Sequence, residues 1–274
     1  MRISRHAETI WHFIFMVTVL VMVFPIIYAF GMSFKPLEDA YNNVLNILPI
    51  NASLENYRTL FASLPVLKIT MNTFVVASVA TVFKLVTSFL AAYAFVYFKF
   101  KGKEVIYFLL IGTIFIPFTV TMIPNYLIIS EIGMLDSVWG VILPQLADAV
   151  GIFLIHQAMK NIPGSLIEVA RLDNMGHGRI MKDIVLPLVR PAVTSVGIWF
   201  FIGTWNEFVW PVLVLKTTEN YTLPLALQMY ISSEGGTNFT VAMAVSVITM
   251  IIPLILYLSF QKYIIGTFTS SGIK

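Results

Sequence analysis

The dominant pattern along the chain is a series of long apolar stretches separated by shorter polar segments. Six stretches are long enough for a helix that crosses a bilayer, which takes roughly 20 residues. They are Ile10–Met32, Asn72–Phe98, Val105–Ile129, Ser137–Met159, Pro191–Leu215 and Thr240–Tyr263. None alternates as a barrel strand does, and a backbone in lipid must satisfy its own hydrogen bonds. The pattern predicts an all-α integral membrane protein with six transmembrane helices in a single domain, residues 1–274.

The distribution of basic residues between these stretches predicts the orientation in the membrane. With the N-terminus inside, twelve Lys and Arg fall on cytoplasmic segments, four fall outside, and Lys84 lies within the second span. An excess of positive charge marks the cytoplasmic loops of membrane proteins. We therefore expect a multi-pass protein with both termini in the cytoplasm.

Composition excludes several classes of function. Only 11% of the residues are charged and 58% are hydrophobic, whereas a soluble domain has about 25% charged residues. The net charge of +3 is spread over short loops, so the expected partner is membrane lipid and not nucleic acid. There is no cysteine, and we find no phosphate-binding loop, no metal-ligand spacing and no Ser/His/Asp set. We predict no catalytic residue, no metal and no cofactor in this chain.

The segment 160–190 is too long for a simple connection between two spans. Pro163 is typical of a helix start, and Ser165 with Glu168 three residues later predicts a capping box. Apolar residues can form one stripe on this helix. They are Ile162, Leu166, Val169, Ala170 and Leu172.

A turn and a second short helix are predicted to follow. Asp173-Asn174 should break the first helix, because Asn tolerates a left-handed backbone. The second helix should run through Ile180 and Ile184 until Pro187 stops it. The pair would lie along the inner face of the membrane. A simple amphipathic anchor for the loop is the alternative interpretation.

The same segment resembles the Glu-Ala-Ala loop of ABC importer permeases. Glu168-Val169-Ala170, a turn, and Ile184-Val185-Leu186-Pro187 have the spacing of that loop. The chain departs from the family pattern at Val169 and at Asn174, which stands where the family has Gly. Both Asn and Gly are suited to a left-handed turn.

Other segments resemble the carbohydrate, or maltose-type, branch of that family. Three of them are Trp205-Asn206-Glu207-Phe208 followed by Trp210-Pro211, the segment Tyr221–Pro224, and Gln261-Lys262-Tyr263 followed by the tail Ser271–Lys274. Ile116-Pro117 and Ile123-Pro124 also resemble its third helix. Together these segments cover most of the chain from about Asn56 onward.

The resemblance implies the fold of a type I ABC importer permease, with a coupling helix between spans 4 and 5. In the family this helix docks on a cytoplasmic ATPase. The residues to which the resemblance assigns this role are Glu168, Ala170, Arg171, Asp173, Asn174 and Gly176. The implied partners are a second permease subunit, two copies of an ATPase that binds ATP and Mg²⁺, and an extracytoplasmic sugar-binding protein. The implied location is a bacterial cell membrane.

Polar side chains inside the predicted spans are candidates for the substrate pathway, because they are costly in lipid. Asn206 and Glu207 stand beside Trp205 and Trp210, and amide, carboxylate and aromatic groups match the hydroxyls and C–H faces of a sugar. Gln145, Asp148, Lys84 and His156 are further polar groups in spans. Hydrogen bonds between helices are the alternative role for this set.

The hypothesis that follows is a permease subunit of an ATP-driven sugar importer. An ABC importer of a non-sugar solute is one alternative. An ATP-independent secondary transporter is another, although neither a repeated half nor coupling-ion carboxylates are evident. A membrane-embedded enzyme would need a catalytic set that the spans lack.

Overall fold

The computed structural model describes residues 5–43, 46–49, 51–231 and 238–270, and the side chains among them from residue 8 to residue 261. Within these ranges the chain is helical and contains no strand. Four helices are long and apolar enough to cross a membrane, and two bent pairs of helices pass the same test together. Counted with each bent pair as one span, the described chain has the six spans that the sequence predicts.

The unbroken spans are long single helices. The first is α1 (Arg5–Ser33), the second is α4 (Val66–Tyr97), and the last is α14 (Phe239–Ser270). Each covers the apolar stretch predicted for it and extends a few residues beyond.

The third and fourth spans are each broken into two helices. Helix α5 (Lys103–Gly112) continues as η1 (Thr113–Phe115) and meets α6 (Phe118–Glu131) at 98°. Helix α7 (Val138–Ile142) continues as η2 (Leu143–Gln145) and meets α8 (Ala149–Lys160) at 45°. Pro117 lies in the first break and Pro144 directly before the second, and Pro lacks the N–H that an unbroken helix needs.

The fifth span begins fourteen residues earlier than predicted. Helix α10 (His177–Arg179), the π-helical stretch η3 (Ile180–Val185) and α11 (Leu186–Trp205) form one helix of 29 residues. Pro187 therefore does not stop the second loop helix, as the sequence suggested. It lies inside this continuous helix, as the second residue after the π-helical stretch. The span ends at Asn206, and α12 (Val209–Val214) follows the break.

The described residues fall into two compact units. Unit 1 comprises Met1–Leu67 and Leu223–Ile252, with α1, α2 (Leu37–Asn42), α3 (Glu55–Ser63), α13 (Leu223–Ile231) and the start of α14. At its centre the buried Asn56 donates to the backbone oxygens of Ser33 and Lys35 and accepts from Thr240. The prediction of a single domain over residues 1–274 stays a prediction.

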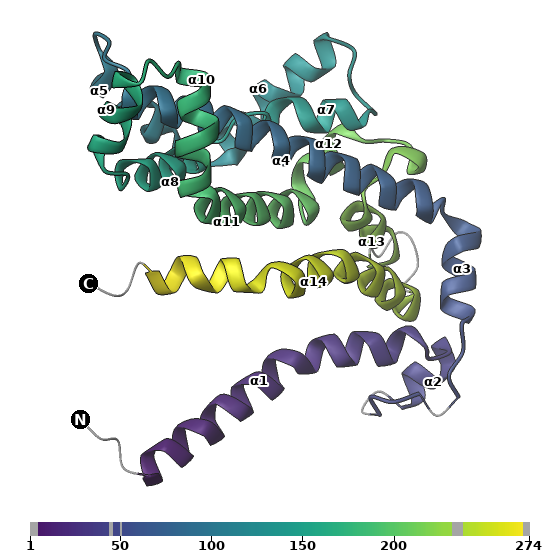
Figure 1. The fold of residues 1–274 in the computed structure, drawn as a ribbon. Helices are drawn as coiled ribbons and strands as arrows, with labels where there is room; N and C mark the ends of the chain where they lie inside the picture. The colour runs from purple at the N-terminus through teal and green to yellow at the C-terminus, as the bar shows by residue number, and fades with distance from the viewer. Residues whose placement is uncertain (1–4, 44–45, 50, 232–237, 271–274) are drawn as a thin grey trace. The chain divides into compact units, whose positions relative to one another are not determined.

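Unit 2 comprises Lys68–Thr222 and Pro253–Lys274. Its core gathers the C-terminal part of α4 with α8, α9 (Gly164–Leu172), η3 and α11, which lie together in Figure 1. Fully buried members include Tyr93, Ile155, Met159, Ile180 and Val185. The segment 160–190 is therefore packed on the spans and is not an isolated loop.

The opposite end of α4 is held by polar contacts. Lys68 forms an ion pair of 2.8 Å with Glu219 in η4 (Thr218–Asn220), and Asn72 donates to the Glu219 carbonyl. Nearby, Asp136 Oδ1 accepts the backbone N–H groups of Lys216 and Thr217 at 2.8 and 2.9 Å. These bonds connect the loop before α7 to the loop after α12 and fix that end of unit 2.

Candidate functional site: a coupling surface and a polar cluster within the spans

Helix α9 presents two apolar faces. Ile167 and Ala170 are 4% and 3% exposed and belong to the core of unit 2. Leu166, Val169 and Leu172 are 45%, 57% and 80% exposed. The single stripe expected from the sequence is thus divided, because Ala170 points inward while the three larger residues point outward. The exposed Leu166, Val169 and Leu172, with the exposed Glu168 between them, are called the docking face below.

The start of α9 differs from the prediction. The helix begins at Gly164 with Pro163 as its N-cap, and no side chain caps it. Ser165 therefore lies inside the first turn, and the predicted capping box with Glu168 is wrong. The Pro that marks the helix start has taken the cap position itself.

The turn after α9 is built as the sequence predicts. Helix α9 ends at Leu172, and Asn174 has φ +55°. The N–H of Met175 donates to Ala170 O at 3.0 Å and that of Asn174 to Arg171 O at 3.0 Å, which is the pattern of a Schellman motif. Asp173 is the residue between helix and turn. This turn fixes the direction in which the chain leaves α9.

Gly176 has a different role from a left-handed turn residue. Its φ is −70°, and it is the N-cap of α10. A Cβ added at this glycine would meet nothing within 4 Å. Its carbonyl accepts from the N–H groups of Arg179 and Ile180 at 3.0 and 3.1 Å, so it starts the helix that becomes the fifth span.

Polar contacts attach the segment to the C-terminal end of α4. The Arg171 guanidinium donates to Tyr97 O at 3.3 Å. The Tyr93 hydroxyl and His177 Nδ1 share a hydrogen bond of 2.9 Å. The ring of Phe98 meets the His177 ring edge to face, with centroids 4.6 Å apart. Arg171 is thus a positioning group in this structure as well as an exposed charge.

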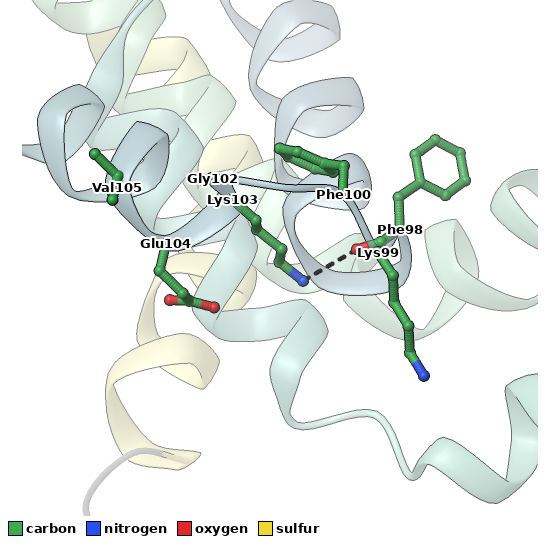
Figure 2. A pocket seen from close by; sticks show the side chains of 7 residues that line it. All are labelled: Phe98, Lys99, Phe100, Gly102, Lys103, Glu104 and Val105. Atoms are coloured by element: carbon green, nitrogen blue, oxygen red, sulfur yellow. Dashed lines mark hydrogen bonds between the residues drawn. The ribbon is translucent and has the colours of Figure 1, made fainter.

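The end of α4 is itself capped from the following loop. Lys103 donates to Phe98 O at 3.2 Å, as the dashed line in Figure 2 shows. This loop surrounds an open hollow. Its lining residues are Phe98, Lys99, Phe100, Gly102, Lys103, Glu104 and Val105. Cations at a helix C-terminus stabilise its free carbonyls, so Lys103 helps to hold the surface against which His177 packs.

A second group of polar residues meets within the spans of unit 2. Lys84 on α4 reaches Gln145 Oε1 at 3.3 Å and Thr204 Oγ1 at 3.4 Å. Its ammonium also lies 5.4 Å from the centroid of the Phe200 ring. Asp148 and Glu207 are close enough to act on its charge. Lys84 therefore does not extend toward a membrane surface but joins spans 2, 4 and 5. The name polar cluster is used below for five residues, which are Lys84, Gln145, Asp148, Thr204 and Glu207.

The two carboxylates of the polar cluster also start helices. Asp148 Oδ1 accepts the N–H groups of Val150 and Gly151 at 2.9 and 3.2 Å. Glu207 Oε1 accepts the N–H of Trp210 at 3.2 Å. Carboxylates suit the N-terminus of a helix because its dipole and free N–H groups favour negative charge. The helix breaks thus bring carboxylates into the spans at positions where the backbone stabilises them.

The two tryptophans predicted for the pathway are buried. Trp205 and Trp210 are 0% and 1% exposed. Trp205 stacks on Phe201 with centroids 5.7 Å apart, and Trp210 Nε1 donates to Gly140 O at 3.2 Å. Neither ring offers a free face in this structure. Asn206 is exposed and donates to Ile202 O at 2.9 Å, where it ends α11.

Sequence reasoning left three residues of these two sites without a role. Thr204 joins the predicted candidate Lys84 in the polar cluster, while Tyr93 and His177 connect the segment 160–190, called the coupling segment below, to α4. A lysine in the middle of an apolar stretch was a usable signal for Lys84. Nothing in the one-dimensional pattern pairs Tyr93 with a residue 84 positions later.

Comparisons with known proteins identify the family of the chain. Residues 84–267 match the family model described as binding-protein-dependent transport system inner membrane component. The chain is 32% identical over 258 residues to the sn-glycerol-3-phosphate transport system permease protein UgpE of Brucella abortus, covering 91% of both chains. It is 30% identical over 267 residues to UgpE of Salmonella choleraesuis, covering 94% of this chain and 95% of the relative.

Solved structures share the fold. A chain of a bacterial ABC transporter involved in import of the acidic polysaccharide alginate matches with a TM-score of 0.79 and 24% identity, covering 95% of this chain and 98% of that one. The fold class predicted from the sequence is thereby confirmed. The matched region contains both the coupling segment and the polar cluster, and the chain belongs to the family of binding-protein-dependent transport system inner membrane components, the permeases of ABC importers.

Proposed function

We propose that this chain is one permease subunit of an ATP-driven importer of carbohydrates or similar polyhydroxylated solutes, and that the docking face of α9 binds the ATPase. The observation that carries the proposal is the division of α9 into a buried face and an exposed apolar face. Exposed Leu, Val and Leu residues around a carboxylate are typical of a protein contact with one charged anchor. Residues Glu168, Ala170, Arg171, Asp173, Asn174 and Gly176 keep the coupling role that the resemblance gave them.

The proposed assembly contains three kinds of protein partner. Two copies of a cytoplasmic ATPase bind ATP and Mg²⁺ and supply the energy, since this subunit has no ATPase site of its own. A second permease, a different chain, provides the other half of the pathway. A sugar-binding protein delivers the solute from outside. One matched alginate transporter was crystallised with a pentasaccharide-bound periplasmic protein, which supports this last partner. Both termini face the cytoplasm of a bacterial cell.

The polar cluster forms the part of the solute pathway that this chain contributes. Lys84 and the amide of Gln145 donate hydrogen bonds, and the carboxylates of Asp148 and Glu207 accept them. Such a set matches a solute that carries several hydroxyls. Asn206 adds an exposed amide near the same break. Trp205 and Trp210 would shape the wall by packing from behind.

The solute class rests on the relatives. The UgpE proteins belong to systems for sn-glycerol 3-phosphate, and the structural matches belong to a system for alginate. Glycerol 3-phosphate carries two hydroxyls and each sugar unit of alginate also carries two. An importer of a phosphorylated polyol is the second candidate, because the curated relatives in the comparison carry that name.

The test of the proposal is co-purification of the transporter from cells that express all its subunits. We expect the chain to purify with an ATPase, and Glu168→Ala or Leu172→Asp to lower the amount of bound ATPase. Asp183→Ala, which removes an exposed carboxylate elsewhere in the segment, is the matched control and should leave it unchanged. Purification without any ATPase, or equal binding in all variants, would contradict the proposal.

A further inference from the structure

The coupling segment reaches two spans by different routes. It continues directly into span 5, since His177–Trp205 is one helix. Its route to span 2 runs through side chains, namely the Tyr93–His177 and Arg171–Tyr97 hydrogen bonds and the apolar core beneath them. A push on the docking face therefore moves span 5 through the backbone, but it moves α4 only as far as these contacts hold.

Two hydrogen bonds attach the coupling segment to α4. Arg171 donates to a backbone oxygen, whereas the Tyr93–His177 bond joins two side chains. Tyr93 is 2% exposed, and its ring packs against Tyr97 with centroids 4.8 Å apart and edge to face against Phe98 at 5.8 Å. His177 is exposed and covers the Tyr93 hydroxyl from outside. Tyr93 is thus fixed in the core of unit 2, while His177 is the first residue of the helix that becomes span 5.

The same helix carries the polar cluster. Lys84 precedes Tyr93 by nine residues on α4, a separation of about 14 Å at 1.5 Å per residue. The α-helical hydrogen bonding of α4 is continuous over this interval. A helix without a break is a stiff element, so a displacement at Tyr93 is carried to Lys84.

We propose that His177 and Tyr93 form the joint that carries motion of the coupling segment into α4 and thereby to Lys84. This proposal rests on the function proposed above and assigns two positioning residues to it. Loss of the joint leaves span 5 attached to the ATPase but weakens the attachment of span 2 to the coupling segment. The expected defect is poor coupling of a complex that still assembles and hydrolyses ATP.

The chain itself provides a matched control for this joint. The Tyr107 hydroxyl and His156 Nδ1 share a hydrogen bond of 3.0 Å between α5 and α8. The chemistry is the same, yet neither residue belongs to the coupling segment or to α4. Tyr107→Phe therefore measures the effect of losing a Tyr–His hydrogen bond outside the coupling segment. Tyr93→Phe measures the effect of losing the hydrogen bond to His177.

The experiment follows α4 directly and needs no knowledge of the solute. Because the chain has no cysteine, Thr87→Cys gives a single reactive thiol in this subunit, one turn from Lys84. The complete transporter is purified from membranes, and the rate of thiol modification by a small water-soluble methanethiosulfonate is measured without nucleotide and with ATP plus vanadate. The labelling of this chain is read on a gel, so thiols of other subunits do not interfere.

We expect nucleotide to change the rate by about fivefold or more, the lower end of ordinary allosteric coupling, in the parent and with Tyr107→Phe. The change should fall below about twofold with Tyr93→Phe or His177→Ala, at unchanged ATPase content. His177→Asn should restore it, because the Asn oxygen stands near the place of Nδ1. The proposal is overturned if nucleotide changes nothing in the parent, if both Tyr variants behave alike, or if the Tyr93 and His177 variants respond normally.

These outcomes are distinct from failure of the proposed function. A chain that purifies without an ATPase contradicts the function. A transporter that binds and hydrolyses ATP, and whose α4 responds normally in the Tyr93 and His177 variants, contradicts only the joint. If His177→Ala fails to assemble, its low ATPase content will show this. The proposal is then tested with Tyr93→Phe, which removes only one oxygen atom.

Discussion

The Lys84 ammonium on α4 lies 3.3 Å from the amide oxygen of Gln145, which follows it in the chain by 61 positions. Within the part of the chain that the structure describes, no carboxylate comes within 4.0 Å of this ammonium. Asp148 and Glu207 are the carboxylates that act on its charge, at longer range. A charge of this kind within a span marks a functional or strongly constrained position.

Lys84→Met is expected to destabilise unit 2, because it leaves Gln145 without a donor and two carboxylates without a nearby cation. Loss of a buried polar partner costs about 1–3 kcal/mol, so the thermal unfolding temperature in detergent should fall. Lys84→Arg should retain more of the stability. Lys68→Met is the control, since Lys68 stands on the same helix in an exposed ion pair that contributes little. Equal unfolding temperatures for both Met variants would contradict the role of Lys84.

Substitutions at Asn174 are expected to follow backbone strain. With φ at +55°, Asn174→Val should cost about 1–2 kcal/mol, whereas Asn174→Gly should be close to neutral. Thermal unfolding and ATPase binding of the three proteins measure this. If Val is tolerated as well as Gly, the Schellman turn does not control the direction of the segment.

The contact at Asp136 predicts a dependence of stability on acid. Partial burial raises the pKa of this carboxyl, whereas the hydrogen bonds from the N–H groups of Thr217 and Lys216 lower it. The lowering is larger, so the pKa lies below its ordinary value of 3.8. The contribution to stability is therefore full above the unfolded pKa and is lost as pH falls through the lower folded pKa. Asp136→Asn should flatten the fall of unfolding temperature below about pH 4. Asp183→Asn is the control and should leave the fall of unfolding temperature as in the parent. An unchanged acid profile in Asp136→Asn would refute the prediction.

Gly140 and Gly203 are expected to respond in opposite ways to alanine. A Cβ at Gly140 would stand 2.2 Å from the Met134 carbonyl oxygen, a backbone atom, whereas a Cβ at Gly203 would meet nothing within 4 Å. Gly140→Ala should cost about 3 kcal/mol through overpacking. Gly203→Ala should be neutral or stabilise by up to about 1 kcal/mol through helix propensity. The reverse order of unfolding temperatures would show that α7 is not packed as described.

The sequence was sufficient for the number of spans and for the coupling turn, because both depend on local properties. Stretch length identifies Asn72–Phe98 as a span, which the structure has at Val66–Tyr97. The tolerance of Asn174 for a left-handed backbone identifies the turn. The prolines of spans 3 and 4 permit kinks, but the sequence does not say which of them breaks a helix. Pro117 and Pro124 are both preceded by Ile, yet only Pro117 separates two helices, while Pro124 lies inside α6. The choice between a kink and a break depends on packing around each proline.

The faces of α9 show a second limit of the one-dimensional pattern. A helix with apolar residues on two sides gives the same run of Leu, Val and Ala as a helix with one broad stripe. Which side is covered depends on α4, α8 and α11, whose positions the pattern does not contain. For the same reason the burial of Trp205 and Trp210, and the direction in which Lys84 extends, required the structure.

The unbroken helix from His177 to Trp205 has a consequence for how torque travels through the protein. A rotation applied at its first turn passes through one continuous helix, in which the π-helical stretch, Pro187 and Pro191 are the points of weaker backbone hydrogen bonding. The first place where the backbone can relieve that twist is Asn206-Glu207-Phe208, directly beside Thr204 and the Lys84 ammonium. A rotation at the cytoplasmic end of this span is therefore expected to change the geometry of the polar cluster.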